Sequence, residues 1–300
     1  MEKRSRGLRE LCRLLGYTPQ AYYQYDRGFS KREMGEDLLI EQVLMHRRLQ
    51  PRLGTRKLLV MLNPFMQEHG IHIGRDRFFE LLRHGGLLVR KKRKRVRTTF
   101  SMHRFRTYAD LTKGLVVSAS GQLWVSDITY VRLKEGFAYL SLITDAYSRK
   151  IIGFFVSHDL STDNTLRALQ MAIKNNALVK GQLIHHSDRG VQYCSRSYTT
   201  LLKKNGIAIS MTQDGNPRDN AIAERVNGIL KQELLHKAYQ SVGDLRLAVK
   251  VAVDIYNQLR PHTSIEMMTP DQAHLKTGNL ERKWQNYYRR QHRKEPIMDG

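Results

Sequence analysis

The stretch QLWVSDITYV, residues 122–131, places an aspartate in the middle of an apolar and β-branched run. Val125, Ile128 and Tyr130 surround Asp127, and this composition is typical of a strand buried on both faces. An unpaired carboxylate in such a strand would cost several kcal/mol. The charge of Asp127 therefore needs a partner, and a metal ion is one candidate.

Two more carboxylates further along the chain could join Asp127 in binding a cation. LIHHSDRG, residues 183–190, reads as a short apolar strand that ends on Asp188, and ligands tend to bind at the carboxyl ends of such strands. RDNAIAERVNGILKQELL, residues 218–235, is helical in composition and carries Glu224. One carboxylate within a strand, one at a strand end and one on a later helix can converge on hard cations, which prefer oxygen ligands.

The helix predicted around Glu224 has one apolar stripe, formed by Ile222, Val226, Ile229 or Leu230, and Leu234. Asn220, Glu224 and Lys231 can then share a neighbouring face. We expect Asn220 either to steady the carboxylate or to cap the helix. Lys231 is expected to contact a phosphate or bases, with a solvated helix lysine as the alternative.

The charge of the chain indicates a polyanionic partner, because 51 Lys and Arg residues outnumber 28 Asp and Glu residues and give a formal charge of +23. Cys12 and Cys194 are far apart, which argues against a disulfide framework or a zinc cluster. The start of the chain does not resemble a signal peptide, and no run of about 18 apolar residues predicts a membrane span. We therefore expect a cytoplasmic, nucleoid-associated protein that binds nucleic acid.

The amino-terminal part, residues 1–89, is expected to be helical and to bind DNA. Residues 8–27 predict a helix, a turn at Gly16 and a second helix with Thr18 as N-cap, which fits a helix-turn-helix as well as an ordinary helical hairpin. We assign this motif to a region over 1–50 that also has a helix over 33–49. A second helical region over 51–89 contains two basic residues placed to meet a phosphate backbone, Arg56 and Lys57.

Two basic segments flank the region that carries the acids. The segment over 90–113 opens with RKKRKRVR, and it is expected either to track nucleic acid or to be an inert spacer. The tail over 276–300 interleaves aromatic and basic residues, as strand-binding segments do, although a disordered basic end is the alternative. The residues of the first segment expected to bind DNA are Arg90, Lys91, Lys92, Arg93, Lys94 and Arg95.

Residues 114–275 predict the order β-β-β-α-β-α-β-α, beginning with an antiparallel meander. This order favours an α/β fold of RNase H-like type, with a mixed five-stranded sheet and helices. The last long helix, DLRLAVKVAVDIYNQL, is expected to bury the stripe Leu247, Val251, Ile255 and Leu259.

Three other residues could be mistaken for parts of a metal site. Asp145 also ends a strand, but the following Ala-Tyr-Ser-Arg favours a local pair with Arg149 or a turn cap. His185 and His186 are adjacent on a strand and should point to opposite faces. We interpret both histidines as structural or as support for Asp188.

Five motifs resemble one known family: WVSDITYV, LITDAYSRKIIG, HHSDRGVQY, GNPRDNAIAERVNGILKQELL and YNQLRPHTSIEMMTP. They are similar to the DDE transposases of bacterial insertion sequences, in particular the second-reading-frame polypeptide of the IS-three family, whose catalytic core resembles retroviral integrase. The resemblance covers nearly the whole chain. It departs from the family pattern before Trp124 and just after Glu224, which bears on the specificity for ends or targets and not on the carboxylates.

The resemblance implies metal-dependent strand cleavage and strand transfer at insertion-sequence ends. Asp127, Asp188 and Glu224 would be the catalytic residues and the ligands of two Mg²⁺ ions, for which Mn²⁺ substitutes. The implied partners are double-stranded DNA with terminal inverted repeats, target DNA, a second copy of the chain, and an upstream-frame helix-turn-helix polypeptide. DNA contacts near the acids are expected from Asn220, Arg225 and Lys231.

Other classes of protein remain open at this point. A catalytically silent repressor or a partner-dependent subunit would keep the basic charge and the helix-turn-helix. An RNase H-type nuclease would share the fold but would prefer an RNA-DNA hybrid. A target-site adaptor would bind DNA equally well in EDTA and never break it.

Overall fold

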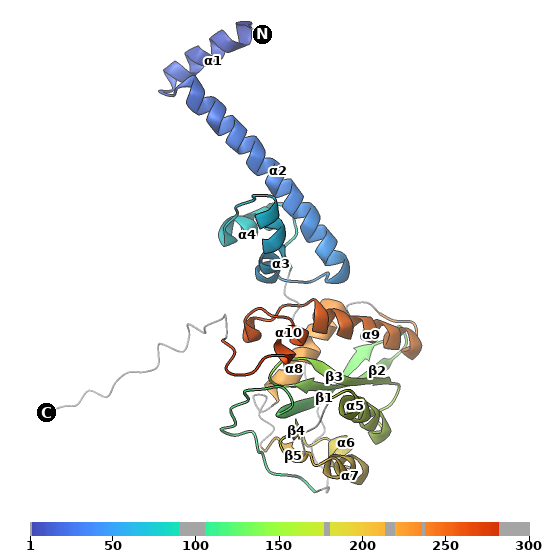
Figure 1. Ribbon diagram of the computed structural model, residues 1–300. Helices are drawn as coiled ribbons and strands as arrows, with labels where there is room; N and C mark the ends of the chain where they lie inside the picture. The colour runs from blue at the N-terminus through green and yellow to red at the C-terminus, as the bar shows by residue number, and fades with distance from the viewer. Residues whose placement is uncertain (1, 90–105, 177–180, 214–219, 236–237, 282–300) are drawn as a thin grey trace, which may run out of the picture. The chain divides into compact units, whose positions relative to one another are not determined.

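The computed structural model describes residues 2–89, 106–176, 181–213, 220–235 and 238–281 (Figure 1). Its contacts divide the chain into two compact units, Met1–Lys91 and Lys92–Gly300. Among the helices described, none combines the length and hydropathy of a membrane span. Two predicted DNA-binding segments lie outside the described residues: Arg90, Lys91, Lys92, Arg93, Lys94 and Arg95, and the tail from residue 282.

The amino-terminal unit consists of α1 (Glu2–Leu14), α2 (Pro19–Leu49), α3 (Thr55–Glu68) and α4 (Arg75–His84). Gly16 makes the turn after α1 with a φ of 74°. The Thr18 hydroxyl accepts the Ala21 N–H at 3.1 Å and caps α2. The predicted turn and cap are therefore confirmed.

α2 is a single helix of 31 residues, whereas the sequence predicted separate helices before residue 27 and after residue 33. Gly28 and Gly35 lie within it, and each weakens a helix by only about 1 kcal/mol. No proline follows Pro19 before Pro51, so every backbone hydrogen bond of the helix can form. Two glycines alone are too weak to divide it.

The carboxyl-terminal half of α2 packs with α3 and α4, as Figure 1 shows. Leu39 and Val43 of α2 share one core with Leu58, Leu62 and Phe78. The boundary expected at residue 50 therefore does not separate two compact units, because this core spans it.

The second unit is built on a five-stranded sheet with the order β3-β2-β1-β4-β5. The strands β1 (Leu123–Arg132), β2 (Phe137–Asp145) and β3 (Ile151–Ser157) form the predicted antiparallel meander. The strands β4 (Ile184–Ser187) and β5 (Ala208–Met211) add in parallel. This is the mixed sheet that the order of elements predicted.

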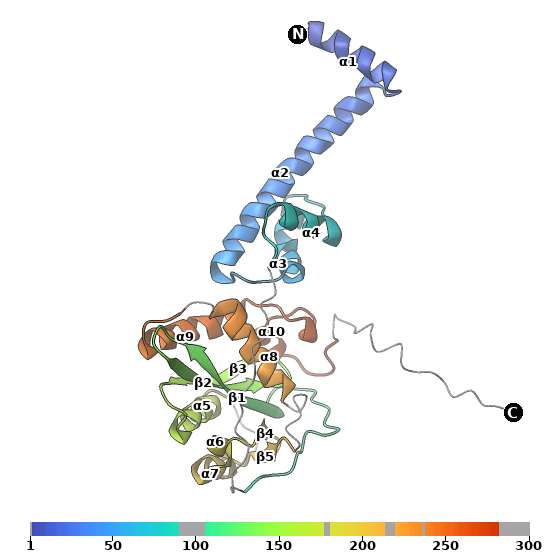
Figure 2. The same cartoon turned by 180° about the vertical axis from the view of Figure 1, so that it is seen from behind.

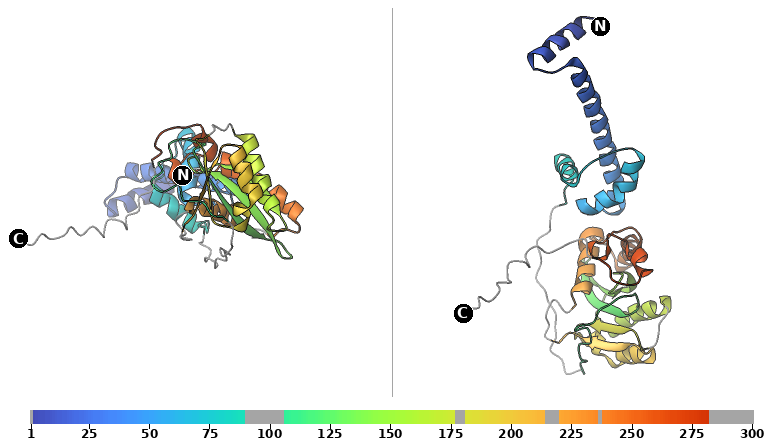
Figure 3. Two further views of the ribbon diagram at one scale, coloured as in Figure 1. Left: turned by 90° about the horizontal axis from the view of Figure 1, so that it is seen from below. Right: turned by 60° about the vertical axis from the view of Figure 1, so that its left-hand side comes forward.

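Helices cover both faces of this sheet (Figures 1, 2 and 3). One face packs on α5 (Thr162–Asn175), α6 (Val191–Cys194) and α7 (Arg196–Lys204). The other packs on α8 (Ala221–Ile229), a π-helical turn η1 (Leu230–Leu234) and α9 (Val242–Gln258). The short η2 (Thr263–Ile265) and α10 (Pro270–His274) follow. A large apolar core lies on each face.

The strand β1 is buried on both faces only in its first half. Residues 123–126 are buried, Asp127 is half-buried and Tyr130 is exposed. The reason is the shortness of β4, whose pairing with β1 ends at Val125 and His186. Beyond that point one edge of β1 is open, so Asp127 stands where the strand leaves the core.

α9 buries a different stripe from the one predicted. Leu245, Val249 and Tyr256 face the core, whereas Leu247 and Val251 are 70% and 57% exposed. Both stripes have helical spacing, and residues two apart lie about 200° apart around a helix. Periodicity alone could not choose between them, and the structure buries the one with the large Tyr256 ring.

Candidate active site

The parallel register of β1 and β4 brings the first two acids together. Trp124 pairs with His185 and Val125 with His186, so two residues further on Asp127 comes level with Asp188. Asp188 follows the last residue of β4, and its Oδ1 accepts the Gly190 N–H at 2.9 Å. Both aspartates line one cavity of about 570 Å³ at the open edge of β1.

Tyr193 also lines this cavity. Its ring is buried, and the hydroxyl has no hydrogen-bond partner among the described residues. Burial raises the pKa of Tyr193 well above its usual value, and the charges of Tyr198, Asp188 and Asp127 add to the effect. The negative charges of Asp127 and Asp188 thus both raise the pKa of the same buried hydroxyl.

α8 and η1 place polar side chains directly on β1. Asn227 donates from Nδ2 to Oδ2 of Asp127 at 2.7 Å, and Lys231 donates from Nζ to the Thr129 hydroxyl at 3.0 Å. Successive side chains of a strand alternate between its faces, so Asp127 and Thr129 share the face that α8 and η1 cover. Sequence reasoning named Lys231 but missed Asn227, although its position one turn after Glu224 could have suggested it.

Lys231 combines a charge with partial burial. Its ammonium lies 4.2 Å from the centroid of the Tyr130 ring. Burial lowers the pKa of Lys231, while the negative charge of Asp127 opposes that shift. The side chain therefore brings a positive charge to the rim of the carboxylate cavity.

Glu224, the third predicted acid, lies in the first turn of α8 and lines a neighbouring hollow of about 360 Å³ with Arg225 and Gly228. It does not line the cavity that holds Asp127 and Asp188. Across the described ranges, no three His, Cys, Asp or Glu side chains are gathered as a metal site. The structure thus brings together two of the three acids.

Asn220 is buried, and its Nδ2 donates to the backbone carbonyl of Ser126 at 2.8 Å. Its side chain makes no capping hydrogen bond with α8. Asn220 does hold the predicted N-cap position, but its amide ties the start of α8 to β1 beside Asp127. Its role in DNA binding stays a prediction.

The other candidate metal ligands are structural. Asp145 is buried and accepts N–H groups from Ser148 and Gly121, each at 2.8 Å, which confirms the predicted turn cap. His185 bonds the Ser126 hydroxyl at 2.7 Å, and His186 bonds the Ser210 hydroxyl at 2.8 Å. The structural interpretation of both histidines is confirmed.

Acid should destabilise the protein through His185. Burial lowers the pKa of His185 from 6.5 to about 3, so the unfolded chain binds the extra proton between these values. The free energy of unfolding should therefore fall by about 1.4 kcal/mol per pH unit as the pH decreases from 6.5 towards 3. Urea unfolding between pH 7 and pH 4 should show a steeper loss for the wild type than for His185→Gln.

The exposed His158 supplies the control for this measurement. His158→Gln should keep the wild-type slope, because His158 lies at the surface and its replacement leaves the buried site intact. Equal slopes in the wild type and His185→Gln would contradict the prediction.

The basic candidates described by the structure lie at the surface in two places. Arg56 is exposed and Lys57 half-buried in the first turn of α3, and Arg225 is exposed on α8 beside Glu224. Their role in DNA binding stays a prediction.

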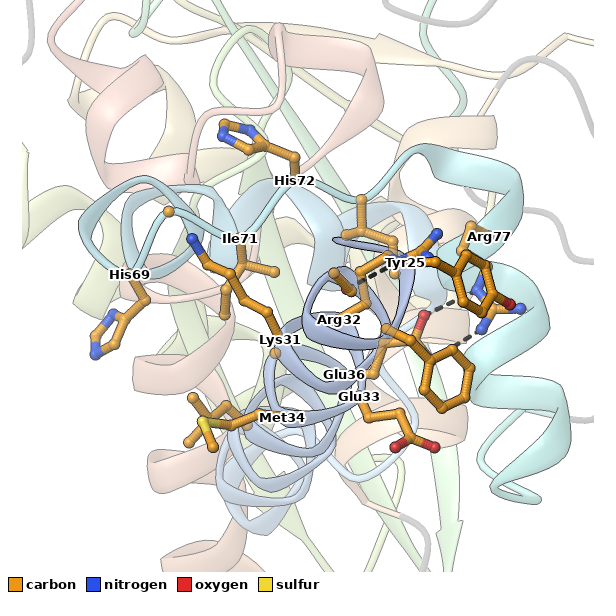
Figure 4. Close-up of a pocket in the computed structure, with 16 residues that line it drawn as sticks. Tyr25, Lys31, Arg32, Glu33, Met34, Glu36, His69, Ile71, His72 and Arg77 are labelled. Carbon is orange, nitrogen blue, oxygen red and sulfur yellow. Dashed lines mark hydrogen bonds and ion pairs between the residues drawn. The ribbon is translucent and has the colours of Figure 1, made fainter. Parts of the chain in front are cut away.

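The amino-terminal unit has a groove of about 810 Å³ beside α2 (Figure 4). Arg77 holds Glu36 there through two hydrogen bonds of 2.8 and 3.0 Å. Lys31 and Arg32 add positive charge to the lining. The charge of Glu36 is thus already balanced by Arg77. The cavity at β1, where two aspartates meet, is the better candidate for chemistry.

Models of the integrase core domain match residues 117–217 and 205–270. The chain is 32% identical over 265 residues to the insertion element IS600 uncharacterized 31 kDa protein of Shigella sonnei, covering 87% of this chain and 96% of that protein. It is 35% identical over 252 residues to a putative transposase for insertion sequence element IS986/IS6110 of Mycobacterium tuberculosis, covering 81% and 89%.

Solved structures are similar at lower identity. The HTLV-2 integrase catalytic core domain in complex with magnesium is 22% identical, with a TM-score of 0.42, over 52% of this chain and 97% of that one. A simian T-cell lymphotropic virus intasome in complex with PP2A regulatory subunit B56 gamma is 19% identical, with a TM-score of 0.46, over 76% and 77%.

The integrase core and its relatives define a polynucleotidyl transferase of the DDE class. Within that class, the chain belongs to the IS-three family of transposases, enzymes that move bacterial insertion sequences.

Proposed function

We propose that the cavity at the open edge of β1 is where this transposase cleaves and joins DNA strands at the ends of its insertion sequence. The observation that carries the proposal is the meeting of Asp127 and Asp188 in one cavity. Two neighbouring carboxylates repel each other unless a cation lies between them, and phosphoryl transfer uses divalent cations held in this way.

The residues present fit such a cation. Asp127 and Asp188 supply hard oxygen atoms, as Mg²⁺ and Mn²⁺ require. Two buried polar atoms nearby, Oδ1 of Asn227 and the Tyr193 hydroxyl, have no hydrogen-bond partner among the described residues. These two oxygen atoms are therefore available to hydrogen-bond a polar ligand beside the two aspartates. We propose that Glu224 completes the set when DNA and metal bind, since it lies one turn before Asn227 on α8.

Bound to these carboxylates, two divalent ions would polarise the scissile phosphate and lower the pKa of the attacking hydroxyl. In cleavage, a water oxygen bonds to phosphorus as the bond to the 3′ oxygen breaks, which leaves a 3′-hydroxyl. In strand transfer, that 3′-hydroxyl bonds to a target phosphorus as the bond to the target strand's 3′ oxygen breaks, and the displaced oxygen leaves as a new 3′-hydroxyl. Asn227 fixes the orientation of the Asp127 carboxylate, and Lys231 offers its ammonium to a phosphate at the rim.

The proposed partners follow from the same chemistry. The DNA ligands are the terminal inverted repeats of the element and a target duplex, and the formal charge of +23 favours both. Cutting and joining two ends requires at least two copies of the chain on DNA. An upstream-frame helix-turn-helix polypeptide is a further proposed partner.

Removing the metal should abolish strand breakage. Purified protein is incubated with labelled DNA carrying the ends of its own element, in Mg²⁺, in Mn²⁺ or in EDTA. We expect nicked and joined products with either metal and none in EDTA. Asp188→Asn should be inactive in all three, although asparagine can still accept the Gly190 N–H.

The matched control is Asp254→Asn, which removes a carboxylate from an exposed position of α9. It should cleave as the wild type does. Equal cleavage in EDTA and Mg²⁺ would refute the metal mechanism. DNA binding without breakage would favour a silent repressor or a partner-dependent subunit instead.

A further inference from the structure

One wall of the carboxylate cavity is aromatic. Tyr130, Phe137 and Tyr139 line it together with Asp127 and Asp188. Tyr130 is 41% exposed and Phe137 is 53% exposed. Their rings meet edge to face, with centroids 5.4 Å apart and an interplanar angle of 84°. Touching, exposed rings at the mouth of a cavity mark a site for a ligand more than a part of the core.

The pairing of β1 with β2 explains why these rings lie together. Tyr130 pairs with Tyr139 and Arg132 with Phe137, so the three aromatic side chains share one face of the hairpin. β4 ends too early to cover this part of β1, since its last described pair with β1 is Val125 with His186. The rings therefore stay accessible in the same cavity as the acids.

Lys231 gives the aromatic wall a positive charge. Its ammonium lies 4.2 Å from the Tyr130 ring centroid and is steadied by the Thr129 hydroxyl. A ligand with a flat ring and a neighbouring phosphate would match both the aromatic rings and the ammonium of Lys231. A nucleotide of the DNA substrate has this chemistry, because bases stack on aromatic side chains and phosphates pair with lysine.

We propose that Tyr130 and Phe137 stack on an unpaired nucleobase next to the scissile phosphate. A base inside a duplex is stacked on both sides by its neighbours, so only a base that has left the helix can meet these rings. The inference rests on the proposed function, since it takes the neighbouring phosphate to be the one that Asp127 and Asp188 act on. The enzyme should consequently favour DNA ends whose last base pairs are open.

The test uses 2-aminopurine, a fluorescent base whose emission is quenched by stacking, placed next to the cleavage position. The full chain is titrated in EDTA with end DNA that is either fully paired or opened at this position, so that no strand is cut. The wild type should quench the probe in opened DNA. Tyr130→Leu and Phe137→Leu should lose the quenching and bind opened DNA about tenfold more weakly, with less than a twofold change for paired DNA.

Ring-preserving variants are the matched controls. Tyr130→Phe and Phe137→Tyr keep an aromatic face, so they should quench as the wild type does. Both positions changed are exposed surface sites of the hairpin, and circular dichroism verifies the fold of each of the four variants. Quenching by the leucine variants equal to that of the wild type would overturn the inference.

The outcomes separate this inference from the proposed function. Ring-dependent quenching without any cleavage in Mg²⁺ would support the nucleobase site and contradict the proposed chemistry. Metal-dependent cleavage, together with equal quenching by the wild type and the leucine variants, would support the proposed chemistry and overturn the nucleobase site. A wild type that fails to bind either DNA would overturn both.

Discussion

Replacing Glu224 with glutamine is expected to slow cleavage at DNA ends at least about a thousandfold while leaving the fold intact. The side chain is half-buried in the first turn of α8 and lines a hollow outside the cavity of the two aspartates. Loss of its charge should therefore change the free energy of unfolding by only about 0.5 kcal/mol. The expected effect is on chemistry alone, because glutamine keeps the shape but offers metal a neutral ligand. Single-turnover cleavage of labelled ends measures it.

The matched control is Glu68→Gln, which removes the same charge from an exposed position at the end of α3. This variant should cleave at the wild-type rate. Near-normal cleavage by Glu224→Gln would show that Asp127 and Asp188 suffice, and that the hollow beside α8 has another use. Since Glu224 lines a different hollow from the two aspartates, this variant tests whether it joins them in the chemistry.

The sequence was sufficient for the sheet and the two aspartates. Asp127 stands out as a charge in an apolar strand, and Asp188 follows a short apolar strand. The parallel pairing that brings the two aspartates level depends on strand order and register, which the structure supplies. The third carboxylate is different, because its position depends on how α8 is tilted and not on register.

Where the sequence prediction was wrong, two patterns of equal quality competed. α9 offers two apolar stripes, and only the shape of the neighbouring sheet selects the one with Leu245 and Tyr256 over the one with Leu247. α2 runs as one helix across residues 28–32, where the sequence predicted a gap between two helices. For Asn227 the sequence offers only its spacing from Glu224, and the contact with Asp127 becomes visible once both are placed in space.

The stability of the second unit is expected to depend strongly on Arg260. Its guanidinium is buried at the end of α9 and bonds Glu233 of η1 through Nε at 2.9 Å and Nη2 at 2.8 Å. Arg260→Met should lower the free energy of unfolding by about 2 to 3 kcal/mol, below the usual cost of breaking a fully buried pair because the Glu233 side chain is 22% exposed. Urea unfolding followed by tryptophan fluorescence measures the loss.

The pair of Arg260 and Glu233 should matter for stability because removing one partner leaves the charge of the other poorly solvated. Arg260→Met leaves the Glu233 carboxylate in a mostly desolvated site, whereas Arg260→Met combined with Glu233→Met removes both charges and should recover most of the lost stability. Lys150→Met provides the comparison, since Lys150 and Asp271 form a pair of similar length, 2.9 Å, whose side chains are about one third exposed. It should cost less than about 1 kcal/mol. Equal losses for Arg260→Met and Lys150→Met would show that burial does not set the strength of the pair, and that η1, with Lys231 on it, is held by its apolar contacts instead.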